Sequence, residues 1–191
     1  MGRNSILQRL DMASWQTSSK VEAVANAVEA LVSADPTDKA IVFSQYRTML
    51  DLVEWRLRGL KGVEVVKLMG DMPLSERRSV LAAFKANPAI KVILMSLKAG
   101  GEGLNLQEAN HVFLLEPWWN PAVEMQAVHR AYRIGQLKAV HATRFITRES
   151  VEEKMLQLQE KKQLVFEGTM DGSSSSLAKL TAEDLAFLFH S

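Results

Sequence analysis

Short apolar runs alternate with amphipathic stretches along most of this chain. Residues 40–43 are wholly apolar, and four further segments with a strand-like pattern follow, at 63–68, 91–95, 111–115 and 139–147. Around them, apolar residues recur every three or four positions, as in a helix with one buried face. Such helices are predicted at residues 20–31, 48–60, 73–84 and 122–132. The pattern predicts an α/β fold, with a parallel sheet and helices on both of its faces.

Capping residues stand where these helices are expected to begin. Ser18 or Ser19 can cap the first helix, because a hydroxyl oxygen accepts from the unpaired N–H groups of the first turn. Asn120 can cap the helix at 122–132, and Pro121 suits its first turn.

Two more helices are predicted after the sheet. Residues 149–166 carry an apolar stripe, and the last helix, at 182–189, follows a Gly/Ser-rich stretch with the composition of a flexible linker. Thr181 can cap that last helix, with Asp184 three residues on, close to a capping box. We expect the helix to dock back on the domain or on a partner lobe, because its apolar residues need a surface to cover.

Composition limits the classes of function. The chain has 191 residues, of which 47% are hydrophobic, which suits one sizeable α/β domain. It has no cysteine, so disulfides and zinc–thiolate sites are excluded from this segment. Its four histidines show no metal-ligand spacing, and we assign no metal. No apolar run approaches the roughly 18 residues that a membrane span needs, so no membrane partner is expected.

Charge is balanced overall but uneven along the chain. The net charge is +1, which gives no global argument for a nucleic-acid partner. Residues 77–101 and 125–148, however, contain lysines and arginines and no acidic residue. Such basic stretches indicate a local polyanion partner, although solvated surface residues would give the same pattern.

Polar and glycine-rich segments follow the predicted strands. Parallel sheets bind ligands at the carboxyl ends of their strands. Those ends carry Ser44-Gln45, Met69-Gly70, residues 96–103 and residues 116–120. The glycines at 100, 101 and 103 allow backbone amides to face an anion, although a tight bend alone would also use them. Their spacing matches neither a phosphate loop nor a dinucleotide fingerprint.

Two arginines form the most specific local pattern. Arg130 and Arg133 lie three residues apart in a predicted helix, so they are expected to share one face. Gln126 and Gln136 flank them. Neighbouring guanidinium groups repel each other and need a polyanion between them, for which a triphosphate is the obvious candidate. The alternative is that they are plain surface arginines.

Three residues before that helix leave more than one interpretation open. Trp118 and Trp119 could stack on bases, although adjacent tryptophans at a strand end more often pack in the protein. Glu116 stands alone at a strand end, where it could orient polar groups. No catalytic base for hydrolysis is evident in the chain.

Several of these motifs together carry a family resemblance. Ser44-Gln45, the Leu68-x-Gly70 step and residues 96–106, 117–121 and 126–136 occur in a characteristic order and spacing. In both respects the chain resembles the C-terminal helicase-like lobe of Swi/Snf-type DNA-dependent ATPases, from about residue 21 to residue 163. Residues 158–162 and 180–189 resemble the nucleotide-excision-repair branch, which includes a yeast radiation-sensitivity ATPase.

The resemblance implies a RecA-like lobe that works with a second one. Two such lobes close on ATP, and the N-terminal lobe supplies the phosphate-loop lysine and the Asp-Glu pair for Mg²⁺. This chain matches the arginine fingers, with Arg130 and Arg133 as catalytic residues. The positions that match the nucleotide side are Gly103, Asn105, Gln126 and Gln136. The positions that match DNA-phosphate contacts are Ser44, Gln45, Gly70, Ser96, Lys98 and Gly100.

The implied function is the second motor lobe of an ATP-dependent translocase on double-stranded DNA, in DNA repair or chromatin remodelling. Its implied partners are DNA held by the phosphate backbone, the N-terminal lobe, nucleosomes and repair factors, and its implied location is the nucleus. Alone, the segment is expected to hydrolyse nothing. His129, Tyr132 and Glu116 depart from the commoner family residues, which leaves the hydrogen bonds around the fingers open.

The resemblance also divides the chain. It implies an N-terminal extension at 1–17, the RecA-like lobe at 18–148, a brace-type helix at 149–167, and a linker with the last helix at 168–191. A rival hypothesis is a non-enzymatic module that docks DNA or a repair partner. An upstream phosphate-loop lysine would discriminate between the two. A dinucleotide-binding oxidoreductase is disfavoured by the glycine spacing.

Overall fold

A five-stranded parallel sheet forms the centre of the molecule. The computed structural model describes residues 16–96, 104–168 and 181–189 of the chain. The strands are β1 (Ala40–Ser44), β2 (Glu64–Leu68), β3 (Ile90–Ser96), β4 (His111–Leu114) and β5 (His141–Arg144). They pair in the order β2-β3-β1-β4-β5, and every pair is parallel. The predicted α/β, RecA-like parallel sheet is confirmed.

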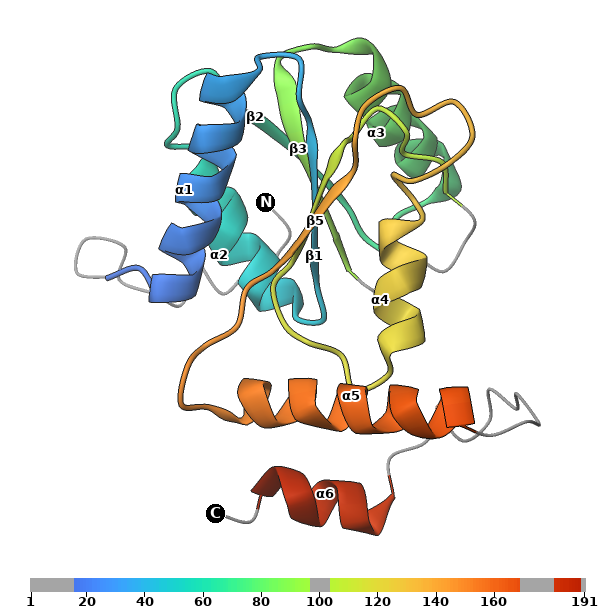
Figure 1. Ribbon diagram of the computed structural model, residues 1–191. Coiled ribbons are helices and arrows are strands. Elements are labelled where there is room, and N and C mark those ends of the chain that lie inside the picture. Colours follow the sequence, from blue (N-terminus) through green and yellow to red (C-terminus); the bar gives the residue numbers. More distant parts are fainter. Residues whose placement is uncertain (1–15, 97–103, 169–180, 190–191) are drawn as a thin grey trace.

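Helices cover both faces of this sheet (Figure 1). Helices α1 (Ser19–Ala34) and α2 (Arg47–Leu57) lie on one face, and α3 (Leu74–Ala86) and α4 (Pro121–Val128) lie on the other. Strand β1 shows why two cores form: Ala40 and Val42 join the α1–α2 core, whereas Ile41 and Phe43 join the α3–α4 core. Successive side chains of a strand point to opposite faces, so a central strand must be apolar throughout.

The predicted caps are present. The Ser18 hydroxyl, rather than that of Ser19, accepts from the amide of Val21 at 3.3 Å. The Asn120 side chain accepts from the amide of Ala122 at 3.0 Å. Each cap pairs an amide that has no partner within its own helix.

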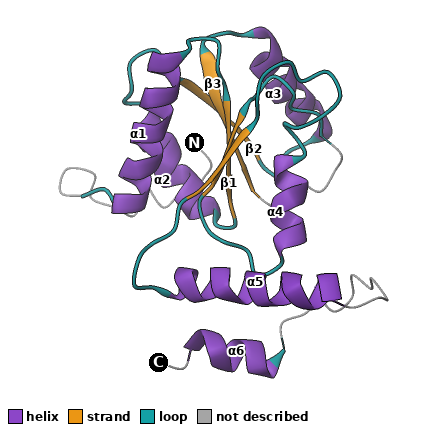
Figure 2. Cartoon of the chain, in the orientation of Figure 1, coloured by secondary structure: helices purple, strands orange, loops and turns teal. Residues whose placement is uncertain are grey.

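Two C-terminal helices lie beyond the sheet (Figures 1 and 2). Helix α5 (Val151–Gly168) runs across the carboxyl ends of the strands, and α6 (Ala182–Phe189) packs against α5. Thr181 and Asp184 form the capping box, and Lys162 of α5 binds the Asp184 carboxylate at 2.8 Å. The expected docking of the last helix is therefore made through α5. None of the described helices is long and apolar enough to cross a lipid bilayer.

Two elements are shorter than predicted by three residues or more. Strand β5 has four residues instead of the nine at 139–147, because it is an edge strand and pairs only along β4. Helix α4 ends at Val128 instead of Tyr132. The predicted Gly/Ser linker falls largely outside the described residues.

Candidate functional site

The two candidate arginines lie in a turn, not on a helix. Residues 129–138, called the arginine turn below, follow the end of α4 at Val128. The prediction that Arg130 and Arg133 share a helical face is therefore wrong. In a continued helix, the carbonyl of Arg130 would accept from the amide of residue 134. Here it accepts from the amide of Leu106 at 3.0 Å, which directs the chain away from the helix axis.

Gln136 anchors the far end of this turn. Its side-chain amide donates to the backbone carbonyls of Gln107 at 2.9 Å and Ala109 at 2.8 Å. Its carbonyl oxygen accepts from the amide of Lys138 at 2.8 Å. The sequence predicts a nucleotide-side role for Gln136; in the structure, its polar atoms hold the turn against the segment that leads into β4.

Gly135 and Lys138 secure the same segment. Gly135 has a φ of 101°, and a Cβ atom there would lie 3.0 Å from the side-chain oxygen of Gln107. The Lys138 ammonium binds the Asp35 carboxylate at 2.9 Å and also that of Asp38, just before β1. The arginine turn is therefore fixed beside the amino ends of β1 and β4.

Two adjoining hollows open at the arginine turn. The smaller, of about 340 Å³, is lined by Gln126, His129, Arg130, Tyr132 and Arg133. The larger, of about 770 Å³, is lined by Asn105, Tyr132, Arg133, Ile134, Gly135, Gln136 and Lys138. The fold thus brings together five of the residues predicted for nucleotide chemistry: Asn105, Gln126, Arg130, Arg133 and Gln136. Gly103 lies outside the described residues.

The electrostatics of the smaller hollow favour an anion. Burial lowers the pKa of the Arg130 guanidinium, and the positive charge of Arg133 lowers that pKa further. The Nε atom of Arg130 is buried, and no hydrogen-bond acceptor reaches it within the described part of the chain. No acidic residue lines either hollow. A partly buried cation beside a like charge is stabilised by a polyanion, so these residues fit the phosphates of a nucleotide.

Residues predicted to hold DNA lie at the opposite end of the sheet. There, Ser44 is fully buried and donates to the Glu116 carboxylate at 2.9 Å. The backbone amide of Gln45 donates to the same carboxylate at 3.1 Å, and the Gln45 side chain donates to the carbonyl of Pro117 at 3.3 Å. Burial raises the pKa of Glu116, and the hydrogen bonds from the Gln45 amide and the Ser44 hydroxyl oppose that rise. Ser44 therefore holds the loop that follows β4 through a buried hydrogen bond to Glu116.

The remaining DNA-side candidates divide between the same edge and undescribed residues. Ser96 ends β3 in register with Ser44, and Gly70 is exposed just after β2. Lys98 and Gly100 lie outside the described residues. We use the name carboxyl edge for residues 44–46, 69–71, 96 and 115–120. The described residues predicted to contact DNA all lie at the carboxyl edge.

The basic stretches are not free of acids in space. Lys85 pairs with Glu108 at 3.5 Å, and the Nε atom of Arg144 lies 2.9 Å from the Glu124 carboxylate. Lys138 has its two aspartates. Lys91 is buried, and its ammonium donates to the carbonyl of Pro36. Charge along the sequence therefore overstated the positive surface.

Glu124 is a functional candidate that the sequence did not reveal. It is 2% exposed in the first turn of α4, and its Oε1 atom accepts from the amide of Trp118 and from the side chain of Gln159, both at 2.7 Å. Trp118 packs against the α3–α4 core, and the Lys162 ammonium lies 5.9 Å from the ring centre of Trp119. Trp118 thus takes a packing role. No sequence signal identifies the partners of Glu124, because they lie six and 35 residues away.

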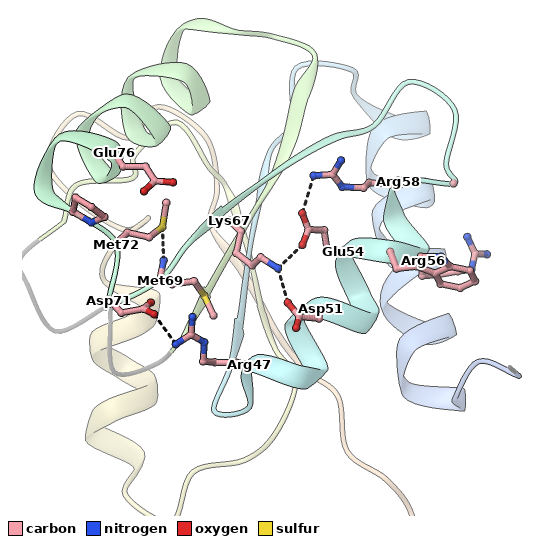
Figure 3. Close-up of a pocket in the computed structure, with 13 residues that line it drawn as sticks. Arg47, Asp51, Glu54, Arg56, Arg58, Lys67, Met69, Asp71, Met72 and Glu76 are labelled. Carbon is pink, nitrogen blue, oxygen red and sulfur yellow. Dashed lines mark hydrogen bonds and ion pairs between the residues drawn. The ribbon is translucent and has the colours of Figure 1, made fainter. Parts of the chain in front are cut away.

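A further hollow lies away from the arginines (Figure 3). It measures about 980 Å³ and is bounded by α2, the end of β2 and the start of α3. Its charges neutralise one another. Arg47 binds Asp71 at 2.9 Å, Arg58 binds Glu54 at 2.8 Å, and Lys67 binds both Asp51 and Glu54. Because each of these three cations already pairs with a carboxylate, a phosphate would gain little by binding here.

No group of three or more histidine, aspartate or glutamate side chains among the described residues could hold a metal ion.

Comparison with known proteins gives several relatives. The chain is 45% identical to the ATP-dependent helicase rhp16 of Schizosaccharomyces pombe, over 97% of this chain and 21% of that protein. It is 41% identical to the DNA repair protein RAD5 of Saccharomyces cerevisiae, over 90% of this chain and 15% of that protein. The chain thus spans about a fifth or less of the length of these curated relatives.

Solved structures and a domain family agree with these relatives. The C-terminal part of the Fun30 ATPase domain superposes with a TM-score of 0.73 at 33% identity, covering 78% of this chain and 48% of that one. The Sulfolobus solfataricus SWI2/SNF2 ATPase C-terminal domain gives a TM-score of 0.67 at 27% identity, covering 96% and 73%. Residues 19–135 match the family described as helicase conserved C-terminal domain. The chain therefore belongs to the helicase conserved C-terminal domain family, and within it to the C-terminal lobes of Swi/Snf-type ATPases.

Proposed function

We propose that this chain is the second motor lobe of an ATP-dependent translocase on double-stranded DNA. In the complete protein, an N-terminal lobe holds ATP and Mg²⁺, and this lobe closes on the nucleotide. Arg130 and Arg133 then stabilise the charge that develops on the transferred phosphoryl group. Asn105 and Gln126 line the same hollows and would help to position the phosphates. ATP would supply the reactive phosphoanhydride, and the Mg²⁺ ligands would come from the other lobe.

The observation that carries this proposal is the state of Arg130. Its guanidinium is partly buried, its Nε atom has no acceptor within the described chain, and Arg133 repels it. An arginine placed only for solubility would stay in water, where its charge costs nothing. The arrangement is explained if a triphosphate supplies the acceptors when the lobes close.

The carboxyl edge supports the DNA half of the proposal. Its exposed backbone at Gly70 and its side chain at Gln45 offer contacts to phosphates, which carry no sequence information. Affinity for DNA is then expected to fall with salt and to be similar for unrelated sequences. The names of the relatives, which include a DNA repair protein, support a role in repair or chromatin remodelling in the nucleus.

The test is to replace each finger in the full-length protein. Arg130→Ala and Arg133→Ala should each lower DNA-stimulated ATP hydrolysis by about 10³-fold, the loss expected for an arginine finger. DNA binding without nucleotide should stay unchanged. The matched control is Arg58→Ala, since Arg58 is an exposed arginine at the C-cap of α2 whose partner is Glu54 of that helix. If both finger variants keep their rate within about threefold of wild type, the assignment fails, since a finger is worth far more.

The same experiment decides the rival function. A module that only docks DNA or a repair partner would bind DNA in a salt-dependent way and hydrolyse no ATP in the wild-type full-length protein. An upstream sequence without a phosphate-loop lysine would agree with that result.

A further inference from the structure

Helix α5 is joined to α4 by a buried polar network, not only by apolar packing. Gln159 is 4% exposed, and its side-chain amide donates to the Glu124 carboxylate at 2.7 Å and to the carbonyl of Trp118. Glu124 also accepts from the amide of Trp118 and pairs with Arg144. Four segments therefore meet at one buried carboxylate: the loop after β4, α4, β5 and α5.

This network controls a large share of the attachment of α4. That helix has eight residues, and its buried residues are Glu124 and Ala127. An alanine buries little apolar surface, and Val123 and Val128, which also pack against the α3–α4 core, are only partly buried, so hydrophobic packing leaves a substantial role to the polar contacts. A carboxylate at 2% exposure, in contrast, holds the Trp118 amide and the Gln159 side chain tightly, because a buried charge that loses a partner is costly.

The arginine turn continues from α4 without a hinge. The amide of His129 donates to Met125, that of Arg130 to Ala127, and that of Tyr132 to Val128, at 2.9 to 3.1 Å. A displacement of α4 is therefore transmitted to Arg130. Catalytic geometry is sensitive to such movement, because a misplacement of about 1 Å can cost on the order of a hundredfold in rate.

Helix α5 is itself fixed at several points on one side. Glu152, seven residues before Gln159, binds the ammonium of Lys20 at 2.5 Å, and Lys20 also donates to the carbonyl of Leu115. Seven residues are close to two helical turns, so both side chains face the sheet. Further on, Lys162 binds Asp184 of α6. A continuous path of contacts thus runs from α6 through α5 and Glu124 to the arginine turn.

We propose that Glu124 and Gln159 are positioning residues that transmit the docking of α5 to Arg130, so that the motor works at full rate only when α5 is seated. The proposal rests on the proposed function for its catalytic consequence. A displacement of α5 from the lobe would then slow hydrolysis without touching the nucleotide.

The experiment compares two glutamines of α5 in the full-length protein. Gln159→Ala removes the buried donor, and Gln157→Ala, on the exposed side of the same helix, is the matched control. Amide hydrogen exchange is measured on peptides covering residues 125–136. Gln159→Ala should speed exchange there by about tenfold, as expected for the loss of a hydrogen bond to a charged group, and Gln157→Ala should leave it unchanged. The kcat for ATP should fall by a similar factor with KM within about twofold, because the nucleotide contacts are misplaced, not removed.

Two further variants keep the result decisive. Gln159→Met fills the same space without a donor, so it tests the hydrogen bond even if the alanine variant unfolds. Glu124→Gln keeps an acceptor for Trp118 and Gln159 but loses the pairing with Arg144, so it should speed exchange at 125–136 by less than Gln159→Ala does. The inference is overturned if Gln159→Met folds and changes exchange only within α5. Absence of any DNA-stimulated ATPase in the wild type would defeat the proposed function, while hydrogen exchange would still decide this coupling.

Discussion

The arginine turn and the carboxyl edge differ in how their polar groups are satisfied. At the carboxyl edge, the key groups pair with each other: Glu116 accepts from Ser44 and from the amide of Gln45. In the arginine turn, the backbone is firmly held, but the Arg130 guanidinium keeps a buried Nε without an acceptor in the described chain. The first region is complete by itself. The second is rigid but chemically incomplete, as expected of half of a site that another lobe and a nucleotide must finish.

The difference separates two tasks of one lobe. A surface that holds a uniform phosphate backbone can be built in advance from backbone and paired side chains. A group that acts only in the transition state should lack a partner in the ground state. A partner there would reduce the difference between its interactions in the two states, and this difference is what accelerates the reaction. The variant expected to separate the two regions most strongly is one that removes Gln136, which anchors the arginine turn.

Gln136→Ala should have the largest effect on stability. It leaves the carbonyls of Gln107 and Ala109 without their donor, and a buried unpaired group costs about 1–3 kcal/mol. Denaturant unfolding of the full protein should show this loss, and ATPase activity should fall more than DNA affinity. Equal losses of both would mean that the turn and the edge are not separable. Gln157→Ala is again the control.

Glu116→Ala tests the carboxyl edge in the same way. It removes the acceptor of Ser44 and of the Gln45 amide, but it also removes a carboxylate whose burial raises its pKa and opposes its charge. The net loss should therefore be smaller, about 1 kcal/mol, and Glu116→Gln should lose less. DNA affinity, measured by a salt titration, should fall while Arg130 keeps its environment. A loss of ATPase with intact DNA binding would contradict the division between the two regions.

Gly135→Ala and Gly62→Ala separate backbone strain from contact. Both glycines have a positive φ, but a Cβ would meet the Gln107 side chain at 3.0 Å only at Gly135, whereas nothing lies within 4 Å at Gly62. Each variant should lose about 1 kcal/mol of stability from the left-handed conformation. Thermal unfolding should show a somewhat larger loss for Gly135→Ala, and only that variant should lower ATPase. Equal losses of stability at both positions would mean that the Gln107 side chain moves away from the new Cβ atom at little cost.

The smallest expected effect concerns pH and the tether of Lys138. Hydrogen bonds from Thr37, and then the contact with Lys138, hold the pKa of Asp35 well below its usual range. A carboxyl group whose pKa is depressed by folding stabilises the folded state at pH values above the pKa that it has in the unfolded chain, near 3.9. This stabilisation is lost as the pH falls below that pKa. The difference in melting temperature between wild type and Asp35→Asn should therefore be present at pH 7 and shrink below about pH 4. A difference that grows on acidification would reverse the assignment.

Much of the fold could be predicted because its signals are local. The apolar run at 40–43 needs only its neighbours in the sequence to be recognised as a buried strand. The caps at Ser18 and Asn120 act on amides two or three residues away. The end of α4 could not be predicted in this way. Its residues suit a helix up to Tyr132, and a competing amide from Leu106 stops it.

The sequence predicted which residues come together at the candidate site, but not how their side chains are arranged. Arg130, Arg133, Gln126 and Asn105 do meet around adjoining hollows. Gln136 and Ser44 belong to the same regions, but their polar atoms bind the protein itself. Sequence reasoning could name these residues because their order is specific. It could not say which of them face a ligand, since that depends on partners elsewhere in the chain.

By itself, the sequence determined the alternation of strands and helices, the caps, and the resemblance to a helicase C-terminal lobe, because periodicity and motif order are properties of neighbouring residues. Only the tertiary structure decided where α4 ends, which charges are neutralised, and how Glu124 connects α5 to the arginines. Lys138 finds Asp35 across 103 residues, and Glu124 finds Gln159 across 35. Pairings of that kind arise when the chain folds on itself, and no local pattern encodes them.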